Sequence, residues 1–524
     1  MLKLSFIKKF FTGAKMKNSN KITLISVDNG WGHYGIRYLS STLKKEKYNT
    51  NLIFLPHAEK YENETILKII DICRDSIFIG ISSMTVYKER AVNLKKILDC
   101  LNIPVLLGGL YPSLSPREAI EHFDYICVGE GEKMILSFAK AIQNNNFTEV
   151  ENLWFKNSNN QISSNFSRTA IKNLDELEAP DYSGENHFLL ENNRLIPLEN
   201  DRIFHAPMFS FLTDRGCPFN CSYCHNNRIK KLTGFSNVRF HSVKYSIEFI
   251  KNILKQFDNI EYIWLQDDDF FYRSESEIIE FSELWKKYIK KPFFILGIPF
   301  NITEEKVSHL VNAGLFQIFV GIQTGSKKIS KLYCRRYVDD SVIEKINHIA
   351  EKYKDRMMFK FDFIILNPFE DTEDIKDSIN IIMKFKPPFY LSLNTLTFMP
   401  DTPLYRYALK KLKGFDSTGI IQDTIYYRFT RLKSFNSNKY LNLILCLMGQ
   451  KNTKKIAGLL PVFMVKFLIS DPVVNFFKNN SSITDKLVIT IERIFIKYYQ
   501  WRDKKYGADM QLPLDLINRQ KLFF

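Results

Sequence analysis

The sequence lacks long apolar runs and a convincing export signal. Nowhere do about 18 uncharged apolar residues follow one another, so we expect no transmembrane helix. The apolar start, Met1–Phe11, is interrupted by Lys3, Lys8 and Lys9, which argues against a secretory signal. Hydrophobic residues make up 45% and charged residues 25% of the chain, which is typical of a globular protein rather than a disordered one. Together these features predict a cytoplasmic protein.

The sequence also lacks the even, regularly spaced cysteines of a disulfide framework. Of its 8 cysteines, three lie close together and the rest are scattered. Three neighbouring cysteines cannot all pair with one another, and no secretory context favours disulfides. The scattered cysteines suit a reducing compartment. They are Cys73, Cys100, Cys127, Cys334 and Cys446.

Length and charge predict several domains with basic ends. At 524 residues the chain is too long for one ordinary domain, so we expect two or three. The net charge is +16, yet residues 1–21 carry 6 lysines and no acids, and residues 405–524 carry an excess of 13 positive charges. Residues 22–404 are therefore nearly neutral. Basic ends favour contact with anionic lipid or nucleic acid, although solvated surfaces have the same composition.

Three cysteines form a tight set, Cys217, Cys221 and Cys224, within the segment Arg215–Asn226. A tetrahedral zinc site would need a fourth ligand, for which His225 is available, but structural zinc sites usually have two separated ligand pairs. A [4Fe–4S] cluster held by three cysteines would leave one iron open to a chelating substrate. Inert buried cysteines are the remaining alternative, although free cysteines seldom cluster in this way.

This segment resembles the signature of the radical S-adenosylmethionine (SAM) enzymes, C-x3-C-x-aromatic-C, with Tyr223 as the aromatic residue. The resemblance implies that Cys217, Cys221 and Cys224 hold a [4Fe–4S] cluster whose open iron is chelated by SAM. An electron from the cluster would then cleave SAM into methionine and a 5′-deoxyadenosyl radical. Tyr223 is expected near the adenine, and Arg215 beside either the SAM carboxylate or its own loop. An electron donor such as flavodoxin or ferredoxin is implied as a partner.

Residues 22–145 alternate continuous apolar strands with helical stretches. This pattern predicts a doubly wound, Rossmann-like parallel sheet that is covered on both faces. Turn residues follow the predicted strands, where the loops of such a sheet line a ligand crevice. The predicted strands are 22–27, 51–55, 77–82, 105–107 and 125–128, and the predicted helices are 35–45 and 89–101.

The loops after these strands resemble the cobalamin-binding domain that precedes many radical SAM domains. The matching phrases are Gly80-Ile-Ser-Ser-Met-Thr85, Val105-Leu-Leu-Gly-Gly-Leu-Tyr-Pro112 and Asp124-Tyr-Ile-Cys-Val-Gly-Glu-Gly-Glu132. The resemblance implies cobalamin contacts from Ser82, Thr85, Gly108, Gly109, Gly129 and Glu130.

The motif D-x-H-x-x-G, which supplies a histidine to cobalt, is absent. His33 has the wrong spacing, so we interpret it as a loop residue. Either cobalamin binds without a lower histidine, or this domain has lost it.

Residues 206–404 again alternate strand and helix, and about six such units predict a partial (β/α)6 barrel of the TIM type. The predicted strands are 208–213, 261–265, 293–297, 316–321, 359–366 and 390–398, and the predicted helices are 243–256, 278–289, 304–313, 340–353 and 373–385. Sites in barrels lie at the carboxyl ends of the strands.

Two strand ends of this predicted barrel carry polar residues. Asp267 and Asp268 lie in a run of three acids that should attract a cation, for which the ammonium of SAM is a candidate, although a solvated acidic turn is the alternative. The phrase Gly321-Ile-Gln-Thr-Gly-Ser326 resembles a family phrase whose Glu or Gln faces SAM, which implies SAM contacts from Gln323 and Ser326.

The remaining segments are a basic N-terminal segment (1–21), a loop-rich linker (146–205) and a basic, mainly helical C-terminal region (405–524). The linker contains the phrase Leu174–Tyr182, which resembles the family's domain junction. In the C-terminal region, apolar residues recur at helical spacing over 483–499, and 440–448 and 456–469 are apolar runs. These helices would either pack on their own domain or lie peripherally on the inner face of a membrane.

The combined features predict a radical SAM enzyme, with cobalamin as a further cofactor, that methylates or rearranges an unactivated carbon. The substrate would be a small molecule or lipid-like, and we expect no nucleic-acid partner. A tRNA methylthiotransferase would need a second three-cysteine cluster, whereas Cys73 and Cys100 fall in predicted helices and Cys127 in a predicted strand. A non-enzymatic iron–sulfur or zinc protein would not need the polar residues at the strand ends.

Overall fold

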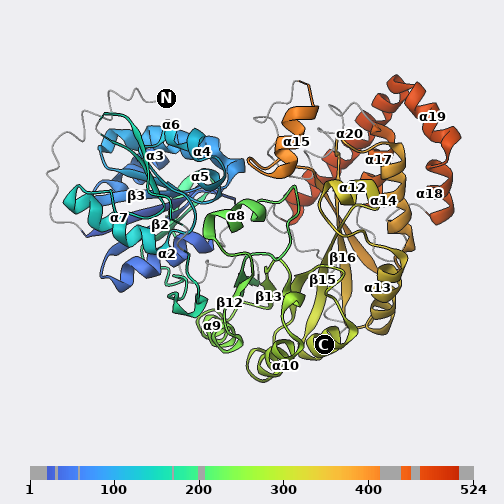
Figure 1. Cartoon of the computed structure of the whole chain (residues 1–524), viewed down its shortest axis with the longest axis horizontal. Helices are drawn as coiled ribbons and strands as arrows, with labels where there is room; N and C mark the ends of the chain where they lie inside the picture. Colours follow the sequence, from blue (N-terminus) through green and yellow to red (C-terminus); the bar gives the residue numbers. More distant parts are fainter. Residues whose placement is uncertain are drawn as a thin grey trace.

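The structure is a computed structural model that describes residues 20–506, except 30–32, 57–59, 158, 168–169, 199–206, 414–437 and 450–460. Figure 1 shows two α/β lobes side by side, with helix α8 (Asn226–Thr233) between them. Helices α18 (Val462–Leu468) and α19 (Asp471–Asn479) lie on the side of the second lobe that faces away from the first (Figure 1). The predicted α/β fold class is confirmed.

The first lobe contains a nine-stranded sheet in the order β7-β6-β5-β4-β3-β1-β2-β8-β9. Strands β5, β4, β3, β1, β2 and β8 run parallel, and β6, β7 and β9 are antiparallel to their neighbours. The strands are β1 (Lys21–Ser26), β2 (Asn49–Phe54), β3 (Ser76–Ser82), β4 (Val105–Gly108), β5 (Tyr125–Cys127), β6 (Leu153–Lys156), β7 (Ile162–Ser164), β8 (His187–Glu191) and β9 (Arg194–Pro197). The strand order reverses between β1 and β3, which is where a sheet of this kind opens a ligand crevice.

Helices cover both faces of this sheet. Leu24 of β1 belongs to a core with Leu43 and Phe138 of the helices on one face, whereas the next residue, Ile25, packs with Ile69 and Leu94 on the other. This alternation explains the continuous apolar character of the strand. The helices are α2 (Tyr34–Lys45), α3 (Asn63–Cys73), α4 (Lys88–Leu98), α5 (Leu110–Leu114), α6 (Pro116–His122) and α7 (Glu132–Asn144).

The segment predicted as a linker, 146–205, contributes strands to the first sheet. Strands β6 and β7 extend one edge, and β8 and β9 extend the other. The loop-rich prediction for this segment missed them because each strand has only three to five residues and polar turns flank it. Where the domains begin and end remains a prediction.

The second lobe contains a six-stranded parallel sheet in the order β10-β13-β14-β15-β16-β17. Its strands are β10 (Met208–Phe211), β13 (Tyr262–Leu265), β14 (Phe293–Gly297), β15 (Leu315–Gln323), β16 (Met358–Ile365) and β17 (Phe389–Thr395). The main helices on its outer face are α9 (Val243–Gln256), α10 (Glu275–Leu284), α11 (Glu304–Ala313), α13 (Asp340–Lys352) and α14 (Thr372–Lys384). The prediction of a partial (β/α)6 barrel is confirmed.

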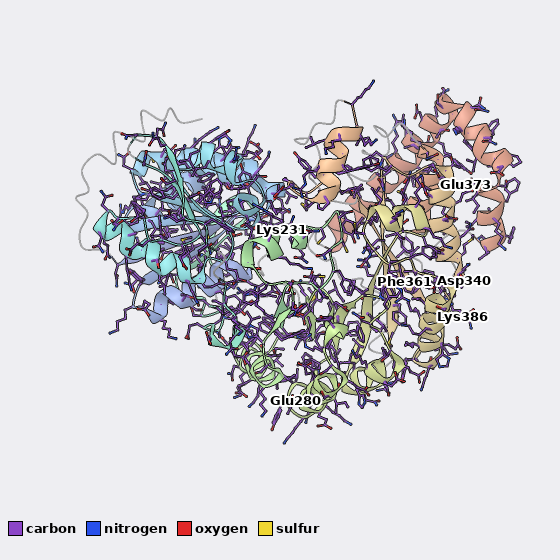
Figure 2. The ribbon with its side chains drawn as sticks, viewed as in Figure 1. Lys231, Glu280, Asp340, Phe361, Glu373 and Lys386 are labelled. Carbon is purple, nitrogen blue, oxygen red and sulfur yellow. The ribbon has the colours of Figure 1, made fainter. Side chains whose placement is uncertain are left out.

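Figure 2 follows this layering from the outside inwards: Glu280 lies on α10 at the outer edge, and Phe361 lies on β16. Phe361 belongs to the core between sheet and helices, and its ring stacks on Phe385 with 3.8 Å between the ring centroids. Lys231 of α8 lies between the two lobes (Figure 2).

The C-terminal region is helical, as predicted. Helix α17 lies against α14 and β17 and buries Tyr440, Leu443 and Leu445, so core packing accounts for the apolar run 440–448. Part of the predicted run 456–469 falls outside the described residues. No helix among the residues that the structure describes is long and apolar enough to cross a membrane. The helices are α15 (Pro403–Lys411), α17 (Lys439–Met448), α18 (Val462–Leu468), α19 (Asp471–Asn479) and α20 (Ser481–Tyr506).

A buried carboxylate holds the junction phrase Leu174–Tyr182 against the first lobe. Asp181 accepts hydrogen bonds from Ser40 Oγ (2.6 Å) and lies 2.8 Å from Lys44 Nζ and 3.3 Å from His187 Nε2. Although burial favours the neutral acid, His187 and Lys44 hold the pKa of Asp181 well below its usual range. Asp181 therefore stabilises the fold as a carboxylate.

We predict that Asp181→Asn destabilises the first lobe by about 3 kcal/mol at pH 7, because it removes one partner of a buried charge pair. Because the pKa of Asp181 is lowered in the folded state, this contribution is present above the pKa of the unfolded carboxyl, which is about 4. It is lost progressively as the pH falls from there towards the pKa of the folded state. Urea denaturation at pH 7 and pH 3.5 measures both effects. Asp75→Asn, at a 60% exposed carboxylate, is the matched control and should change stability by less than about 0.5 kcal/mol. A loss at Asp181 no larger than at Asp75 would contradict the prediction.

Candidate active site

The three-cysteine loop lies just after the first strand of the second sheet. It follows β10 and the two-residue strand β11 (Asp214–Arg215), which pairs with β12 (Arg239–Phe240). Gly216 has φ +104°, a left-handed conformation that glycine adopts without strain and that turns the chain into the loop. Helix α8 begins two residues after Cys224. The loop thus lies at the carboxyl edge of the sheet, where barrel sites occur.

Backbone hydrogen bonds from distant segments fix this loop. Ser222 N donates to the carbonyl of Tyr333 (2.9 Å), Ser222 Oγ donates to that of Leu332 (2.6 Å), and Leu404 N donates to that of Ser222 (2.9 Å). The partners lie at the end of α12 (Lys327–Leu332) and the start of α15. The cysteine positions therefore depend on elements more than 100 residues later in the chain.

The three thiols are free and lie in a partly buried setting. Burial raises the pKa of Cys217 and of Cys224 to about 12, so bare thiolates would be unfavourable there without a cation. Such a donor set fits a [4Fe–4S] cluster, whose irons supply the positive charge. Among the described residues, no group of His, Cys, Asp or Glu side chains is arranged to hold a single metal ion.

Arg335 lies against one of these thiols, and the sequence analysis did not identify it. Its Nη1 lies 3.2 Å from Cys221 Sγ and 3.4 Å from Tyr223 Oη, and its Nη2 donates to the carbonyl of Gly321 (2.8 Å). The guanidinium thus joins the cysteine loop to the end of β15. Tyr223 also packs edge-on against Tyr333, with 4.9 Å between the ring centroids. The sequence analysis offered no signal for Arg335, because its contacts come from segments distant in sequence.

The acidic run at the end of β13 is held mainly by protein groups. Asp267 is fully buried, accepts from Thr213 N (2.6 Å) and pairs with Arg273 (3.0 Å). The predicted cation near Asp267 is thus Arg273, which comes from the same loop, rather than a ligand. Asp269 accepts from Ile298 N (3.1 Å) and from Asn301.

Asp268 is the exposed carboxylate of this run. Asn226, at the start of α8, donates to it over 2.7 Å. Desolvation by the surrounding chain raises the pKa of Asp268 to about 6, and the negative charges of Asp267 and Asp269 also raise it. The hydrogen bond from Asn226 acts in the opposite direction and lowers the pKa. Of the two carboxylates predicted to contact SAM, Asp268 is the one that the fold leaves at the rim beside the cysteine loop.

Gln323 and Ser326, the two residues predicted to contact SAM from the end of β15, have different surroundings. Gln323 has φ +72° after a bulge in the strand, and its amide makes no hydrogen bond within the described part of the chain. Ser326 is buried: its hydroxyl donates to Asp374 (2.6 Å) and caps α12 by accepting from Ile329 N (3.2 Å). The structure therefore leaves Gln323 available to a ligand, whereas the Ser326 hydroxyl is used within the fold.

The residues predicted to contact cobalamin gather at the carboxyl edge of the first sheet. Ser82 and Gly108 are register partners at the ends of β3 and β4. Gly109 has φ +96°, and a side chain there would approach Ser83 O to 2.7 Å, so only glycine fits this turn. The buried hydroxyls of Thr85 and Tyr111 have no hydrogen-bond partner in the described part of the chain. Small residues and two unsatisfied hydroxyls at the carboxyl ends of β3 and β4, beside the point where the strand order reverses, fit a large polar cofactor.

Glu130, which was predicted to contact cobalamin, forms ion pairs with arginines of the second lobe. It pairs with Arg239, lies 3.5 Å from Arg215 and accepts from Ile171 N (3.0 Å). Glu132 pairs with Arg215 over 2.7 Å. Although burial opposes the charge, Arg239 and Arg215 lower the pKa of Glu130. Arg215 therefore steadies its own loop through these two acids.

His33 lies at the start of α2, where its Nδ1 is 3.0 Å from Ser26 Oγ and its ring stacks on Phe54. This position agrees with its interpretation as a loop residue.

Helix α8 brings the two edges together. It begins right after the cysteine loop and contacts α5, which follows β4. Leu232 of α8 is buried in the core of the first lobe. The carboxyl edge of the first sheet and the cysteine loop of the second are thus joined through one short helix (Figure 1).

Comparisons with known proteins agree with this geometry. The profile of the B12 binding domain matches residues 20–139, and that of the Radical SAM superfamily matches residues 212–382. An uncharacterized methyltransferase of Pyrococcus horikoshii is 25% identical over 382 residues, which are 72% of this chain and 78% of that protein. The bacteriochlorophyllide d C-8(2)-methyltransferase of Chlorobaculum tepidum is 25% identical over 348 residues, 63% of this chain and 68% of that protein.

The solved structure of OxsB, described as a cobalamin-dependent S-adenosylmethionine radical enzyme with aqua-cobalamin bound, has a similar fold. The TM-score is 0.65 at 14% identity, and the match covers 92% of this chain and 81% of that chain. At this identity the likeness concerns the fold.

We predict that Arg335→Met lowers the reduction potential of the reconstituted cluster by several tens of millivolts, because it removes a positive hydrogen-bond donor from Cys221 Sγ. Redox titration followed by EPR of the reduced cluster measures the shift. Arg336→Met is the matched control, since Arg336 lies over the ring of Phe300 instead. Equal potentials in both variants would rule out this role for Arg335.

Proposed function

Because this chain is a radical SAM enzyme with an N-terminal B12-binding domain, we propose that it methylates or rearranges an unactivated carbon of a small molecule. A [4Fe–4S] cluster, SAM and cobalamin are its cofactors. The observation that carries the proposal is the position of the cysteine loop, which lies at the carboxyl edge of one parallel sheet and continues into a helix that packs on the other. The two cofactor sites thereby face each other across α8.

Within this proposal the side chains of the cysteine loop and its rim have separate tasks. Cys217, Cys221 and Cys224 hold the cluster, which supplies an electron for the reductive cleavage of SAM when it is bound. Asp268 and Gln323 offer a carboxylate and an amide to the polar groups of SAM. Arg335 and Tyr223 hold the loop against β15, and Asp267 and Ser326 keep the surrounding turns in place.

On the opposite side, the first sheet would hold cobalamin through the turns after β3 and β4. The main contacts are proposed from Ser82, Thr85, Gly108 and Gly109, with Gly129 completing the edge. Gly129 has φ +110° and donates through its N–H to Ser113 Oγ over 3.1 Å. His33 lacks the spacing of the cobalt-ligand motif, so we propose that cobalamin binds here without that histidine. Glu130 contributes by holding the two lobes together.

The names of the relatives support a small-molecule substrate. One relative is named for a methyl transfer to bacteriochlorophyllide d, and the other is named a methyltransferase without a stated substrate. A lipid-like substrate and a flavodoxin or ferredoxin as electron donor remain parts of the proposal.

Anaerobic reconstitution with iron, sulfide, SAM and a reductant tests the central reaction. We expect 5′-deoxyadenosine to form with the wild type and to fall by roughly a thousandfold or more with Cys221→Ala, since the open-iron cluster is lost. Cys100→Ala, a cysteine of the first lobe, is the matched control and should retain turnover. Production of 5′-deoxyadenosine that is unaffected by Cys221→Ala would exclude the proposed chemistry.

Adding cobalamin to the reconstituted protein and separating the unbound fraction tests the first lobe alone.

We also propose that the chain contacts the inner face of a membrane through α18 and α19. Phe463 and Phe467, one turn apart on α18, are 72% and 66% exposed, and Phe476 on α19 is also exposed. Lys466 and Lys478 lie on the same two helices and are exposed. Apolar rings flanked by lysines favour an interface with anionic lipid. Both helices lie at the outer edge of the molecule (Figure 1).

Sedimentation with phosphatidylglycerol-containing vesicles measures this contact. We expect Phe463→Ser with Phe467→Ser to weaken binding by roughly tenfold or more, because two exposed rings no longer enter the interface. Phe166→Ser, at an exposed ring of the first lobe, is the matched control. If the double variant binds the vesicles as strongly as the wild type does, α18 does not form the membrane contact and the proposal is refuted.

A further inference from the structure

Helix α17 of the C-terminal region buries an amide side chain, that of Asn442, within an otherwise apolar run. Leu443 and Leu445 of this helix belong to the core, whereas Asn442 is polar and only 1% exposed. Burying an amide costs free energy unless its oxygen and nitrogen find hydrogen-bond partners. The partners of Asn442 therefore indicate why an amide stands at this position of the helix.

The amide of Asn442 binds the residue that follows β16. Its Oδ1 accepts a hydrogen bond from Leu366 N (3.2 Å), and its Nδ2 donates to the carbonyl of Asn438 (3.2 Å). Leu366 has φ +57°, a left-handed conformation that a bulky residue keeps only when its surroundings hold it there. The hydrogen bond to Asn442 is such a restraint, and it acts where β16 turns into its loop.

Asn438, the residue before α17, holds the other end of the same loop. Its Oδ1 accepts from Thr372 Oγ1 (2.9 Å) at the start of α14, and its Nδ2 donates to the carbonyl of Glu370 (3.3 Å). The first turn of α17 thus grips the loop between β16 and α14 at both ends. This loop lies at the carboxyl edge of the second sheet, the edge that also carries the cysteine loop.

Tyr333 joins this loop to the cysteine loop. Asn367 Nδ2 donates to Tyr333 Oη over 3.0 Å, and both residues are buried. The carbonyl of Tyr333 accepts from Ser222 N (2.9 Å), and its ring packs against that of Tyr223. A continuous series of hydrogen bonds and backbone steps therefore runs from α17 to the segment between Cys221 and Cys224.

We propose that Asn442 is a positioning residue of the active site, which acts through Leu366, Asn367 and Tyr333 to hold the cysteine loop where its cluster binds SAM. The C-terminal region thereby takes part in building a site to which it contributes no ligand. This inference rests on the proposed function for the binding of SAM, whereas the coupling between α17 and the cysteine loop exists independently of the reaction.

Hydrogen exchange of the reconstituted full chain, followed by mass spectrometry, tests the coupling without SAM. We expect Asn442→Leu to speed the exchange of residues 219–226 by roughly fivefold or more, because Leu366 N loses its acceptor and the support behind Tyr333 loosens. Tyr333→Phe, which removes only the hydroxyl that accepts from Asn367, should have the same effect. Leu443→Ala is the matched control, since it opens a cavity beside the same helix but leaves this series of contacts intact. Its exchange over 219–226 should equal that of the wild type.

Titration with SAM, followed by EPR of the reduced cluster, measures the consequence for the site. We expect the dissociation constant of SAM to rise by roughly tenfold in Asn442→Leu and in Tyr333→Phe, and by less than about twofold in Leu443→Ala. The double variant of Asn442 and Tyr333 should bind SAM no more weakly than the weaker single variant. Both substitutions interrupt one series of contacts, so their effects do not add.

Exchange of 219–226 that stays at the wild-type rate in Asn442→Leu and Tyr333→Phe would overturn the proposal, and so would equally fast exchange in Leu443→Ala. Faster exchange with an unchanged affinity for SAM would refute the positioning role. If Asn442→Leu fails to fold, Tyr333→Phe carries both measurements. A wild type that neither binds nor cleaves SAM refutes the proposed function, and the exchange rates still test the coupling of α17 to the cysteine loop.

Discussion

The ion pairs between the two lobes are the interaction on which the rest of the site depends. Glu130 and Glu132 follow β5 of the first sheet, and they pair with Arg239 and Arg215 of the second lobe. Arg215 lies two residues before Cys217, so the charge network ends at the cysteine loop itself. The partners are largely buried, which makes each ion pair costly to break once it has formed. Their mutual position fixes how far the loop lies from the edge of the first sheet.

A second constraint is the direction of parallel strands. In both lobes the functional residues follow the carboxyl ends of strands, because loops at that edge carry no sheet hydrogen bonds and are free to vary. In the first lobe, Ser82 and Gly108 end neighbouring strands. In the second lobe, the cysteine loop, Asp268 and Gln323 lie at the ends of β10, β13 and β15. Helix α8 connects the two edges, so the fold brings two separate ligand sites to one boundary.

Much of the fold followed from local pattern. The strands of the first sheet are continuous apolar runs and the helices are periodic in apolar residues, and the predicted helices 243–256 and 304–313 agree with the observed α9 and α11. The linker strands β6 to β9 were missed because three to five residues carry too little periodicity, and they form only by pairing with edges already built. The C-terminal region was predicted to be helical, with packing on its own domain as one of two alternatives. For α17 the structure shows this packing, because the helix contacts α14 and β17.

The amino-acid sequence by itself indicated the [4Fe–4S] and SAM chemistry, because one local segment around Cys217, Cys221 and Cys224 resembles a family signature. It also determined the two sheets, since strand and helix periods are local properties. Only the tertiary structure decided what the charged and polar residues near the site do. Asp267 is paired with Arg273, Ser326 caps α12, and Glu130 joins the lobes, each through partners that sequence spacing does not reveal. Arg335 reaches Cys221 for the same reason: 114 residues separate them in sequence, and the closing of the barrel brings them within 3.2 Å.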